Sequence, residues 1–315
     1  MEIKKFIIED GILKDCEIEY EFGTGDVIIP EGVLEIGPDF LGLYGVVEHL
    51  HIPASVVKIH SGAFSGCERI TTTTVDPDNT VYHVSGNCII DTVAKKLVVG
   101  GSNPTIASDG TVTEIGAYAF NCRKIQRIEI PNTITSINFM AFSWTELKEL
   151  LLPDNLEFID SHAFALNNHL TSIRIPKSVT KMGNGVFTGC NNLNSITVDK
   201  NNPVYKDYEN CIIEANTMSL IAACNNSVIP EGVKCIPDFT ITMLDNCESI
   251  YVPESVVEIG QANFELCYKF YKDENGNKIT RRPKFTIKSK AGSHAITFAK
   301  NKKIPYEEIR EIEQI

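Results

Sequence analysis

Two histidines of this 315-residue chain have a spacing that could serve a metal site. His49 and His51 alternate on a short apolar stretch, so both side chains would point to the same side of a strand. A zinc site would need a further ligand from a neighbouring strand, where the equivalent residues are Thr72 and Thr74. Because threonine is a poor ligand for a transition metal, we expect an ordinary polar pair and no metal site.

Four of the ten cysteines occupy a recurring place in the sequence, and three of them lie nine residues before a recurring Pro or Asp. They are Cys67, Cys122 and Cys190, with Cys267 matching by its distance from a phenylalanine. Stacked repeats about 4.8 Å apart would bring such cysteines within reach of disulfides or a shared metal. However, no CxxC pair occurs, and Trp or Leu takes the same place elsewhere. We therefore expect buried, reduced and unligated thiols.

Catalytic sequence motifs are absent. The chain has no glycine-rich phosphate loop, no GxSxG and no HExxH, and many of its carboxylates lie in turns such as Pro30-Glu31-Gly32. We expect no cofactor and no enzyme activity; an enzyme with a site built by inserted segments is the weakest alternative.

The overall charge and hydropathy exclude other classes of partner. The net charge of −12 argues against nucleic-acid binding, which needs a basic surface. No stretch of about 18 apolar residues occurs, so we expect no membrane insertion. The N-terminus lacks the apolar core of a signal peptide, so the chain as given predicts a cytoplasmic protein.

One segment of this acidic chain is basic. Residues 278–303 contain nine Lys or Arg and no Asp or Glu. These are Lys278, Arg281, Arg282, Lys284, Lys288, Lys290, Lys300, Lys302 and Lys303. The segment predicts either a site for an anion or acidic partner, or a solvated cap that is partly neutralised by the glutamates of residues 307–313.

The elements that position these residues are repeats. Eight phenylalanines align with a spacing of 22 to 25 residues where nothing intervenes. They are Phe40, Phe64, Phe120, Phe142, Phe164, Phe187, Phe239 and Phe264. In most repeats an Ile or Met lies about five residues upstream, and an apolar-x-apolar-Pro or apolar-x-apolar-Asp element lies about a dozen residues downstream.

The alternation in that element predicts a short strand with one buried face, ended by the Pro or Asp. Each repeat is too small to bury its apolar side alone, so stacking must bury a continuous core beneath a parallel sheet. We expect a solenoid of about eight coils.

Two matching inserts interrupt the repeats. Asn79, Tyr82 and Cys88 recur as Asn202, Tyr205 and Cys211, with an offset of 123 residues and no gap. Two apolar runs in each insert predict a β-hairpin that projects from the solenoid. The expected organisation is an N-terminal cap at 1–26, a solenoid at 27–287 with hairpin inserts at about 76–105 and 199–227, and a C-terminal cap and tail at 288–315. Within the last region, Ser293 should cap a short helix, and an acidic tail should follow from residue 307.

The repeat unit resembles the BspA-like leucine-rich repeat. It reads Val112-x-x-Ile115-Gly116-x-x-Ala119-Phe120-x-Cys122-x-x-Ile125-x-x-Ile128-x-Ile130-Pro131, and the closing segment reads Gly292-Ser293-x-Ala295-x-x-x-Ala299-Lys300. The resemblance implies an α/β, β-rich, right-handed leucine-rich-repeat solenoid with a parallel β-sheet face and short helical turns. Members of this bacterial and protozoal family are mostly surface proteins that bind other proteins or host matrix, which implies a cell-surface or secreted location and no catalytic residues.

The alternation leaves one face of each strand open to solvent. Its outward residues vary while their neighbours stay apolar, so we predict a protein-interaction module that binds a partner there. The candidate residues are His49, His51, Arg127, Glu129, Glu149, Leu151, Arg174 and Tyr251. The alternative is an adhesin that binds matrix or carbohydrate and whose leader is missing.

Overall fold

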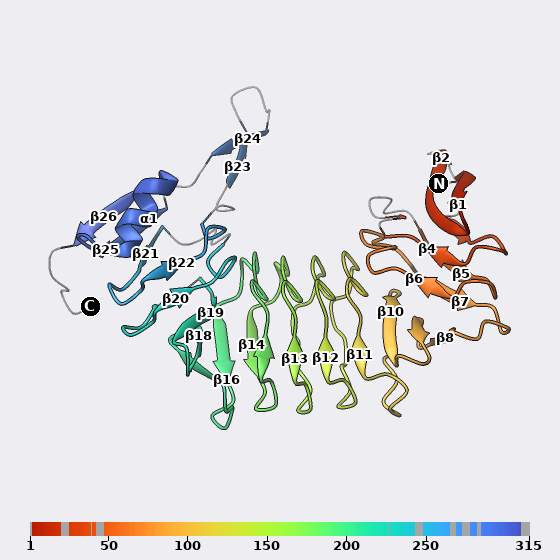
Figure 1. Ribbon diagram of the computed structural model, residues 1–315, viewed down its shortest axis with the longest axis horizontal. Coiled ribbons are helices and arrows are strands. Elements are labelled where there is room, and N and C mark those ends of the chain that lie inside the picture. Colours follow the sequence, from red (N-terminus) through yellow and green to blue (C-terminus); the bar gives the residue numbers. More distant parts are fainter. Residues whose placement is uncertain are drawn as a thin grey trace.

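The protein is a β-rich solenoid of about 11 turns that bends into an arc, with both ends of the arc rising toward the same side (Figure 1). The computed structural model describes residues 2–19, 25–38, 40–41, 47–225, 227–242, 248–264, 269–272, 278–281 and 285–309. Each coil runs from an open-face strand through a Pro- or Asp-led corner to a short anchor strand. A turn segment then leads to the next coil, so the coil has three sides.

The anchor strands form the longest parallel ladders, which the sequence did not predict as sheets. Several end at a buried aliphatic residue such as Ile36, Ile115 or Ile137, none of which has exposed surface. The three ladders contain β2 (Ile12–Glu19), β4 (Glu35–Ile36) and β6 (Lys58–Ile59); β10 (Lys96–Gly100), β11 (Glu114–Ile115), β12 (Ser136–Ile137), β13 (Phe158–Ile159) and β15 (Lys181–Met182); and β19 (Ser219–Ala223), β20 (Cys235–Ile236) and β22 (Glu258–Ile259). The backbone of these two-residue strands therefore fixes the coil spacing.

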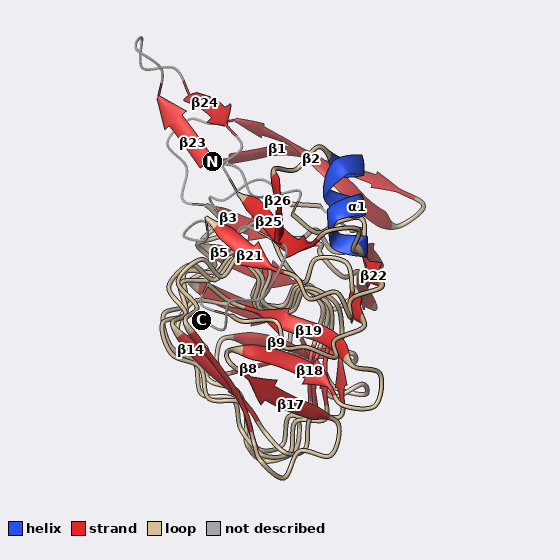
Figure 2. Ribbon diagram, turned by 90° about the vertical axis from the view of Figure 1, so that its left-hand side faces the viewer, coloured by secondary structure: helices blue, strands red, loops and turns tan. Residues whose placement is uncertain are grey.

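The open-face strands are longer but fall into three separate parallel sheets. They are β3 (Asp26–Ile28), β5 (His49–Ile52) and β7 (Thr72–Val75); β14 (Ser172–Ile175) and β16 (Ser195–Val198); and β21 (Ser249–Tyr251), β25 (Thr286–Lys290) and β26 (Tyr306–Ile309). Figure 2 shows β14 and β21 on one side of the solenoid and β22 and α1 on the other.

The predicted parallel sheet of the open face is present but is interrupted in the middle of the solenoid. Residues 128–130 and 150–152 are not part of a strand. In these two coils the Pro follows the core Phe by 11 positions, Phe120 to Pro131 and Phe142 to Pro153, whereas Pro176 follows Phe164 by 12. The shorter segment between the Phe and the Pro coincides with the loss of strand pairing on the open face.

The phenylalanine core lies under the turn segments. Phe120, Phe142, Phe164 and Phe187 stack in sequence, with neighbouring ring centroids 5.0, 5.6 and 5.9 Å apart. Two of the eight aligned phenylalanines are out of register: counting five residues from the anchor isoleucine places Leu41 and Ile241 at the core position. Phe40 is buried beside its register position, and Phe239 lies half-buried on the surface.

The two apolar runs of each insert pair as the antiparallel hairpin that the sequence predicted, but each insert also has a third strand and does not project from the solenoid. Each is a three-stranded antiparallel unit: β8 (Tyr82–Ser85), β9 (Cys88–Asp91) and β10, and likewise β17 (Tyr205–Tyr208), β18 (Cys211–Glu214) and β19. They do not project, because β10 and β19 take anchor positions and pair in parallel with β11 and β20. Their apolar runs fill the core, as the complete burial of Cys88, Ile89 and Leu97 shows. The inserts and the N-terminal strand β2 supply the three turns beyond the eight that were expected.

The 123-residue duplication is repeated in the hydrogen bonds. The Asn79 amide donates to the carbonyl oxygens of Pro53 and Val56, and its Oδ1 accepts from two backbone N–H groups. Asn202 makes the same four contacts one block later. The hydroxyl oxygens of Tyr82 and Tyr205 each accept from an anchor-strand N–H at 2.8 Å. Both inserts are therefore held to the preceding coil by the same contacts.

The caps close the two ends. At the N-terminus, β1 (Glu2–Glu9) pairs antiparallel with β2. At the C-terminus, helix α1 (His294–Lys302) is capped by Ser293 and buries Ala295, Ile296, Phe298 and Ala299, as predicted. The first residues of the acidic C-terminal segment are part of the last sheet, because β26 pairs with β25 up to Ile309. An antiparallel pair, β23 (Lys269–Lys272) and β24 (Lys278–Arg281), lies before the last coil.

Candidate functional site

The open face carries the predicted binding residues with the predicted orientation. Arg127, Glu129, Glu149, Leu151 and Arg174 are exposed. Their alternating neighbours Ile130, Leu150, Ile173 and Ile175 are buried. The register derived from the sequence is therefore confirmed even where the backbone is not paired as a strand.

The centre of this face combines ion pairs with an exposed leucine. Arg127 Nη2 lies 3.9 Å from Glu149 Oε2, and Arg174 Nη2 donates to Asp199 Oδ2 at 2.6 Å. A backbone hydrogen bond from Asn201 and then the charge of Arg174 lower the pKa of Asp199. Leu151 is 86% exposed and borders a hollow of about 310 Å³. An exposed apolar side chain among charged ones matches the apolar centre and polar rim of a protein interface.

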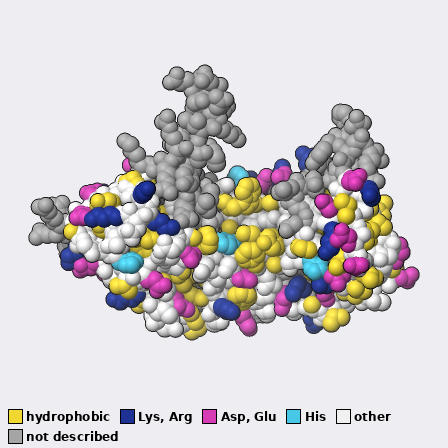
Figure 3. Space-filling view, turned by 45° about the horizontal axis from the view of Figure 1, so that its top comes forward, with side chains coloured by type: hydrophobic (Ala, Val, Ile, Leu, Met, Phe, Trp, Pro, Cys, Tyr) yellow, Lys and Arg dark blue, Asp and Glu magenta, His cyan; other side chains and the backbone are white. Residues whose placement is uncertain are grey.

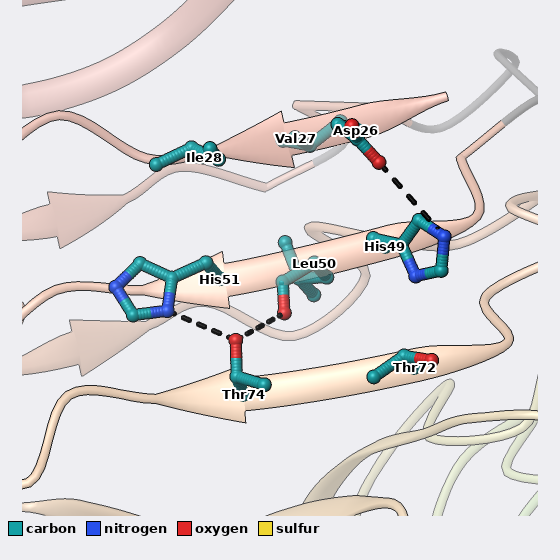
Figure 4. Close-up of a pocket in the computed structure, with 8 residues that line it drawn as sticks. All are labelled: Asp26, Val27, Ile28, His49, Leu50, His51, Thr72 and Thr74. Atoms are coloured by element: carbon teal, nitrogen blue, oxygen red, sulfur yellow. Dashed lines mark hydrogen bonds and ion pairs between the residues drawn. The ribbon is translucent and has the colours of Figure 1, made fainter. Parts of the chain in front are cut away.

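A second hollow of about 350 Å³ lies over β3, β5 and β7 (Figure 4). The two histidines of β5 point to different neighbours: His49 Nε2 lies 3.9 Å from Asp26 Oδ1, and His51 Nδ1 lies 2.9 Å from Thr74 Oγ1. Asp26, which the parallel register places beside His49, was not predicted from the sequence, where only the threonines of the other neighbouring strand were apparent. Among the described residues no group of three His, Cys, Asp or Glu could hold a metal ion.

The C-terminal part of the open face carries Tyr251. Its hydroxyl donates to Glu231 Oε1 at 3.2 Å, and burial together with that carboxylate raises the pKa of Tyr251. The tyrosine is half-buried, so it is less accessible than the central residues.

The basic segment is partly neutralised where the structure describes its side chains. Lys288 lies 3.2 Å from Glu307, Lys290 lies 2.7 Å from Glu254, and Lys300 lies 2.9 Å from Glu308. Lys303 is the left-handed C-cap of α1. Arg282 and Lys284, and the side chains of Lys278 and Arg281, lie outside the described residues. These pairs support the reading of a neutralised cap; the anion site stays a prediction.

The cysteines fall into two environments. Cys67 and Cys190 are buried, as predicted, and donate to the carbonyl oxygens of Leu41 and Phe164. Burial raises the pKa of Cys67 to about 11 and that of Cys190 to about 12. The prediction is wrong for Cys122, which is only partly buried. It lies two residues after Phe120, whereas Cys67 and Cys190 lie three residues after their phenylalanines. Cys267 lies outside the described residues.

Arg123 occupies the position that is equivalent to Cys67 and Cys190, and the sequence analysis missed it. Its side chain is 1% exposed and donates only to carbonyl oxygens. Nε contacts Gly100 O at 2.8 Å, Nη1 contacts Asn121 O at 3.2 Å and also Cys67 O, and both terminal nitrogens contact Phe64 O. A single Arg at a position that is elsewhere Cys, Thr, Asn, Tyr or Leu was the available signal. The residue joins the coils on either side of the first insert.

A search against protein-family models matches almost the whole chain. The model of the BspA type leucine rich repeat region matches residues 8–111, 113–222 and 211–310. The comparison with curated proteins finds no match.

Solved structures of bacterial leucine-rich repeat proteins are also similar. One from Eubacterium ventriosum is 19% identical with a TM-score of 0.51, over 80% of this chain and 68% of that one. A leucine rich cell surface protein from Faecalibacterium prausnitzii is 23% identical with a TM-score of 0.47, over 82% and 71% of the two chains. The pneumococcal vaccine antigen PcpA is 17% identical with a TM-score of 0.47 over 84% of this chain, which spans only 56% of its length. At this identity the likeness shows the fold alone.

Proposed function

Because the chain belongs to the BspA type leucine rich repeat family, we propose that it is a non-catalytic module that binds a protein partner on its open face. The observation that carries the proposal is Leu151, which is 86% exposed at the centre of that face. Charged side chains surround it, and a hollow of about 310 Å³ adjoins it. A protein interface of this kind places an apolar anchor inside a polar rim.

The flanking charges would give this interface its specificity. Arg127 and Glu149 are each more than three quarters exposed, so their 3.9 Å pair is weak in isolation. A partner that excludes water from the pair would strengthen it and would be selected for complementary charges. His49 and His51 form a separate polar area at the N-terminal end of the same face and would contact only a long partner.

The proposed location of the protein rests on what is typical of its family. Proteins of this family are typically surface or secreted proteins, and the Faecalibacterium prausnitzii neighbour is a cell surface protein. No helix within the described part of the chain could cross a membrane. We propose a location at the cell surface or in the medium, in which the protein would act as an adhesin toward matrix.

The proposal is tested by comparing what two variants capture. The double variant Leu151→Ala/Arg174→Ala alters the centre of the open face, and Lys181→Ala alters an exposed residue on the anchor side. Immobilised wild-type protein and both variants are incubated with cell-surface extract, and bound proteins are quantified by mass spectrometry. A partner that is lost only from the double variant supports the proposal. If all three proteins capture the same set in the same amounts, the open face is not the binding surface.

A further inference from the structure

The turn segments of three consecutive coils carry non-glycine residues, most of them large, in a left-handed backbone conformation. One row contains Tyr118, Met140 and His162, with φ of 61°, 51° and 57°. The other contains Cys122, Trp144 and Leu166, with φ of 60°, 58° and 62°. We call these six residues the concave array, because the turn segments line the inner side of the arc in Figure 1.

The neighbouring coils show what these positions ordinarily hold. In the coil before the first insert they are Gly62 and Gly66, and in the coil after the array they are Gly185 and Gly189, all with positive φ. Glycine adopts this conformation without a steric penalty, whereas a large residue does so rarely and at a cost. The fold therefore accepts glycine at both positions, and the three central coils keep bulky side chains in spite of the backbone strain.

Core packing does not account for these side chains. The residues between the two rows, such as Ala141 and Phe142, are fully buried, whereas every member of the array is at least partly exposed. Trp144, the single tryptophan of the chain, is 61% exposed. Figure 3 turns the inner side of the arc toward the viewer and shows hydrophobic side chains gathered over its middle coils, with a histidine beside them.

The first row belongs to a line of aromatic rings that runs along the solenoid. Ring centroids lie 5.4 Å apart between Tyr118 and Phe139, 6.0 Å between Phe139 and His162, and 4.9 Å between His162 and Phe239. Phe239 comes from the coil after the second insert. It reaches His162 because the intervening residue is Gly185, where a Cβ would lie 2.8 Å from Phe239 and 2.7 Å from the His162 ring. The line therefore continues across the insert.

The array carries no fixed charge in a chain of net charge −12. Its immediate surroundings are mostly amides and hydroxyls, such as Asn138, Ser161 and Asn184, all partly or fully exposed, with one carboxylate, Asp160, near His162. The lysine nearest in sequence to Cys122, Lys124, is held 2.9 Å from Glu68. Burial lowers the pKa of His162, so this side chain is neutral near pH 7. The surface thus complements a neutral ligand rather than an ionic one.

We propose that the concave array binds a neutral polysaccharide that lies along the solenoid axis. The C–H faces of its sugar rings would pack on the aromatic and apolar side chains, and its hydroxyl groups would bond to the adjoining amides and hydroxyls. A repeating ligand suits this surface, because the coils repeat about every 4.8 Å, close to the length of one extended pyranose unit. An extended peptide advances about 3.3 Å per residue and would not keep this step.

This site is separate from the open face, so the proposal can be tested independently of the proposed function. The test measures retardation of the full chain in native gels that contain laminarin, galactomannan, xyloglucan or soluble starch, with anionic alginate as a fifth probe. The variants are Trp144→Gly and Met140→Gly, which place glycine where the backbone favours it and should leave the melting temperature unchanged or raised. The control is Leu151→Ala on the open face.

We expect at least one neutral polysaccharide to retard the wild-type chain, with the dissociation constant raised at least tenfold by Trp144→Gly and less than twofold by Leu151→Ala. Three results would overturn the proposal: no neutral probe binds, alginate binds as well as the neutral probes, or Trp144→Gly binds as tightly as wild type. If instead Trp144→Gly abolishes capture of a protein from the cell-surface extract while no polysaccharide binds, the array is a protein-docking surface and the proposal is wrong.

Discussion

The buried guanidinium of Arg123 should couple the N-terminal core to the central one. Two of the carbonyl oxygens that it contacts belong to Phe64 and Cys67, which are part of the N-terminal hydrophobic cluster. The others belong to Gly100 in the first insert and Asn121 in the central coils. The substitution Arg123→Met keeps a long side chain and removes every donor.

The expected cost follows from these contacts. Each buried carbonyl that loses its donor costs about 1–3 kcal/mol, and Phe64 O keeps a second donor in the Cys67 N–H at 3.4 Å. In the wild type the charge of Arg123 is buried without a carboxylate partner, which is itself unfavourable. The substitution by methionine removes this charge, so part of the cost is offset. We expect a net loss of about 3 kcal/mol in the free energy of unfolding, near the value for removing one partner of a buried polar network.

The assay combines urea denaturation, followed by circular dichroism, with hydrogen exchange. If Arg123 is the link, exchange should accelerate in amides of residues 47–75 more than in those of residues 134–175, because the N-terminal coils would open separately. The matched control is Arg127→Met, the same substitution four residues later on a side chain that is 79% exposed, which should change stability by less than about 0.5 kcal/mol. An Arg123→Met protein as stable as this control would refute the reasoning.

Four further results are expected. On the open face, Leu151→Ala should cost less than about 0.5 kcal/mol and Ile175→Ala roughly 2–5 kcal/mol in a denaturant melt; equal costs would mean that the register is wrong. Asn79→Ala and Asn202→Ala should each cost about 2–4 kcal/mol because each removes four equivalent hydrogen bonds, and a clear difference between them would show that the two inserts are not held alike. In thiol titration of the native protein Cys122 should react before Cys67 and Cys190, whose raised pKa values of about 11 and about 12 keep them protonated; simultaneous reaction would contradict this. Because burial lowers the pKa of His162, the unfolded state binds more protons, so the contribution of this side chain to stability should be fully present above its ordinary pKa of about 6.5 and be lost as the pH falls below that value; His162→Gln should reduce the loss, and an unchanged pH profile would argue against it.

Much of the fold could be predicted from the sequence because the pattern of apolar and polar residues within one repeat determines which side chains are buried. The alternation that buries Ile173 and exposes Arg174 needs no tertiary information, since side chains of a strand point to opposite faces. The duplication at an offset of 123 residues identified the two inserts as equivalent, and their hydrogen bonds agree. The helix after Ser293 followed from its N-cap and apolar spacing.

The path of the backbone between coils was decided only by the tertiary structure. A two-residue strand such as β12 is too short to show an alternation of apolar and polar residues. The ladders of anchor strands therefore could not be predicted from the sequence and depend on the stacking of the coils. The same holds for β10 and β19: their apolar runs fit a hairpin or an anchor strand equally well, and the choice depends on the neighbouring coil.

The candidate sites divide along the same line. Outward residues of the open face, such as Arg127 and Leu151, follow from alternation within one repeat. The proximity of His49 to Asp26 depends on the register of two strands, and the contacts of Arg123 depend on hydrogen bonds between coils. The residues involved lie 23 to 59 positions apart in the sequence. The concave array depends on φ angles, and sequence shows only that glycine at two turn positions is replaced by large residues in the central coils. The direction in which a side chain points is determined by the alternation within one repeat, whereas the contacts between coils are determined by the stacking of the whole solenoid.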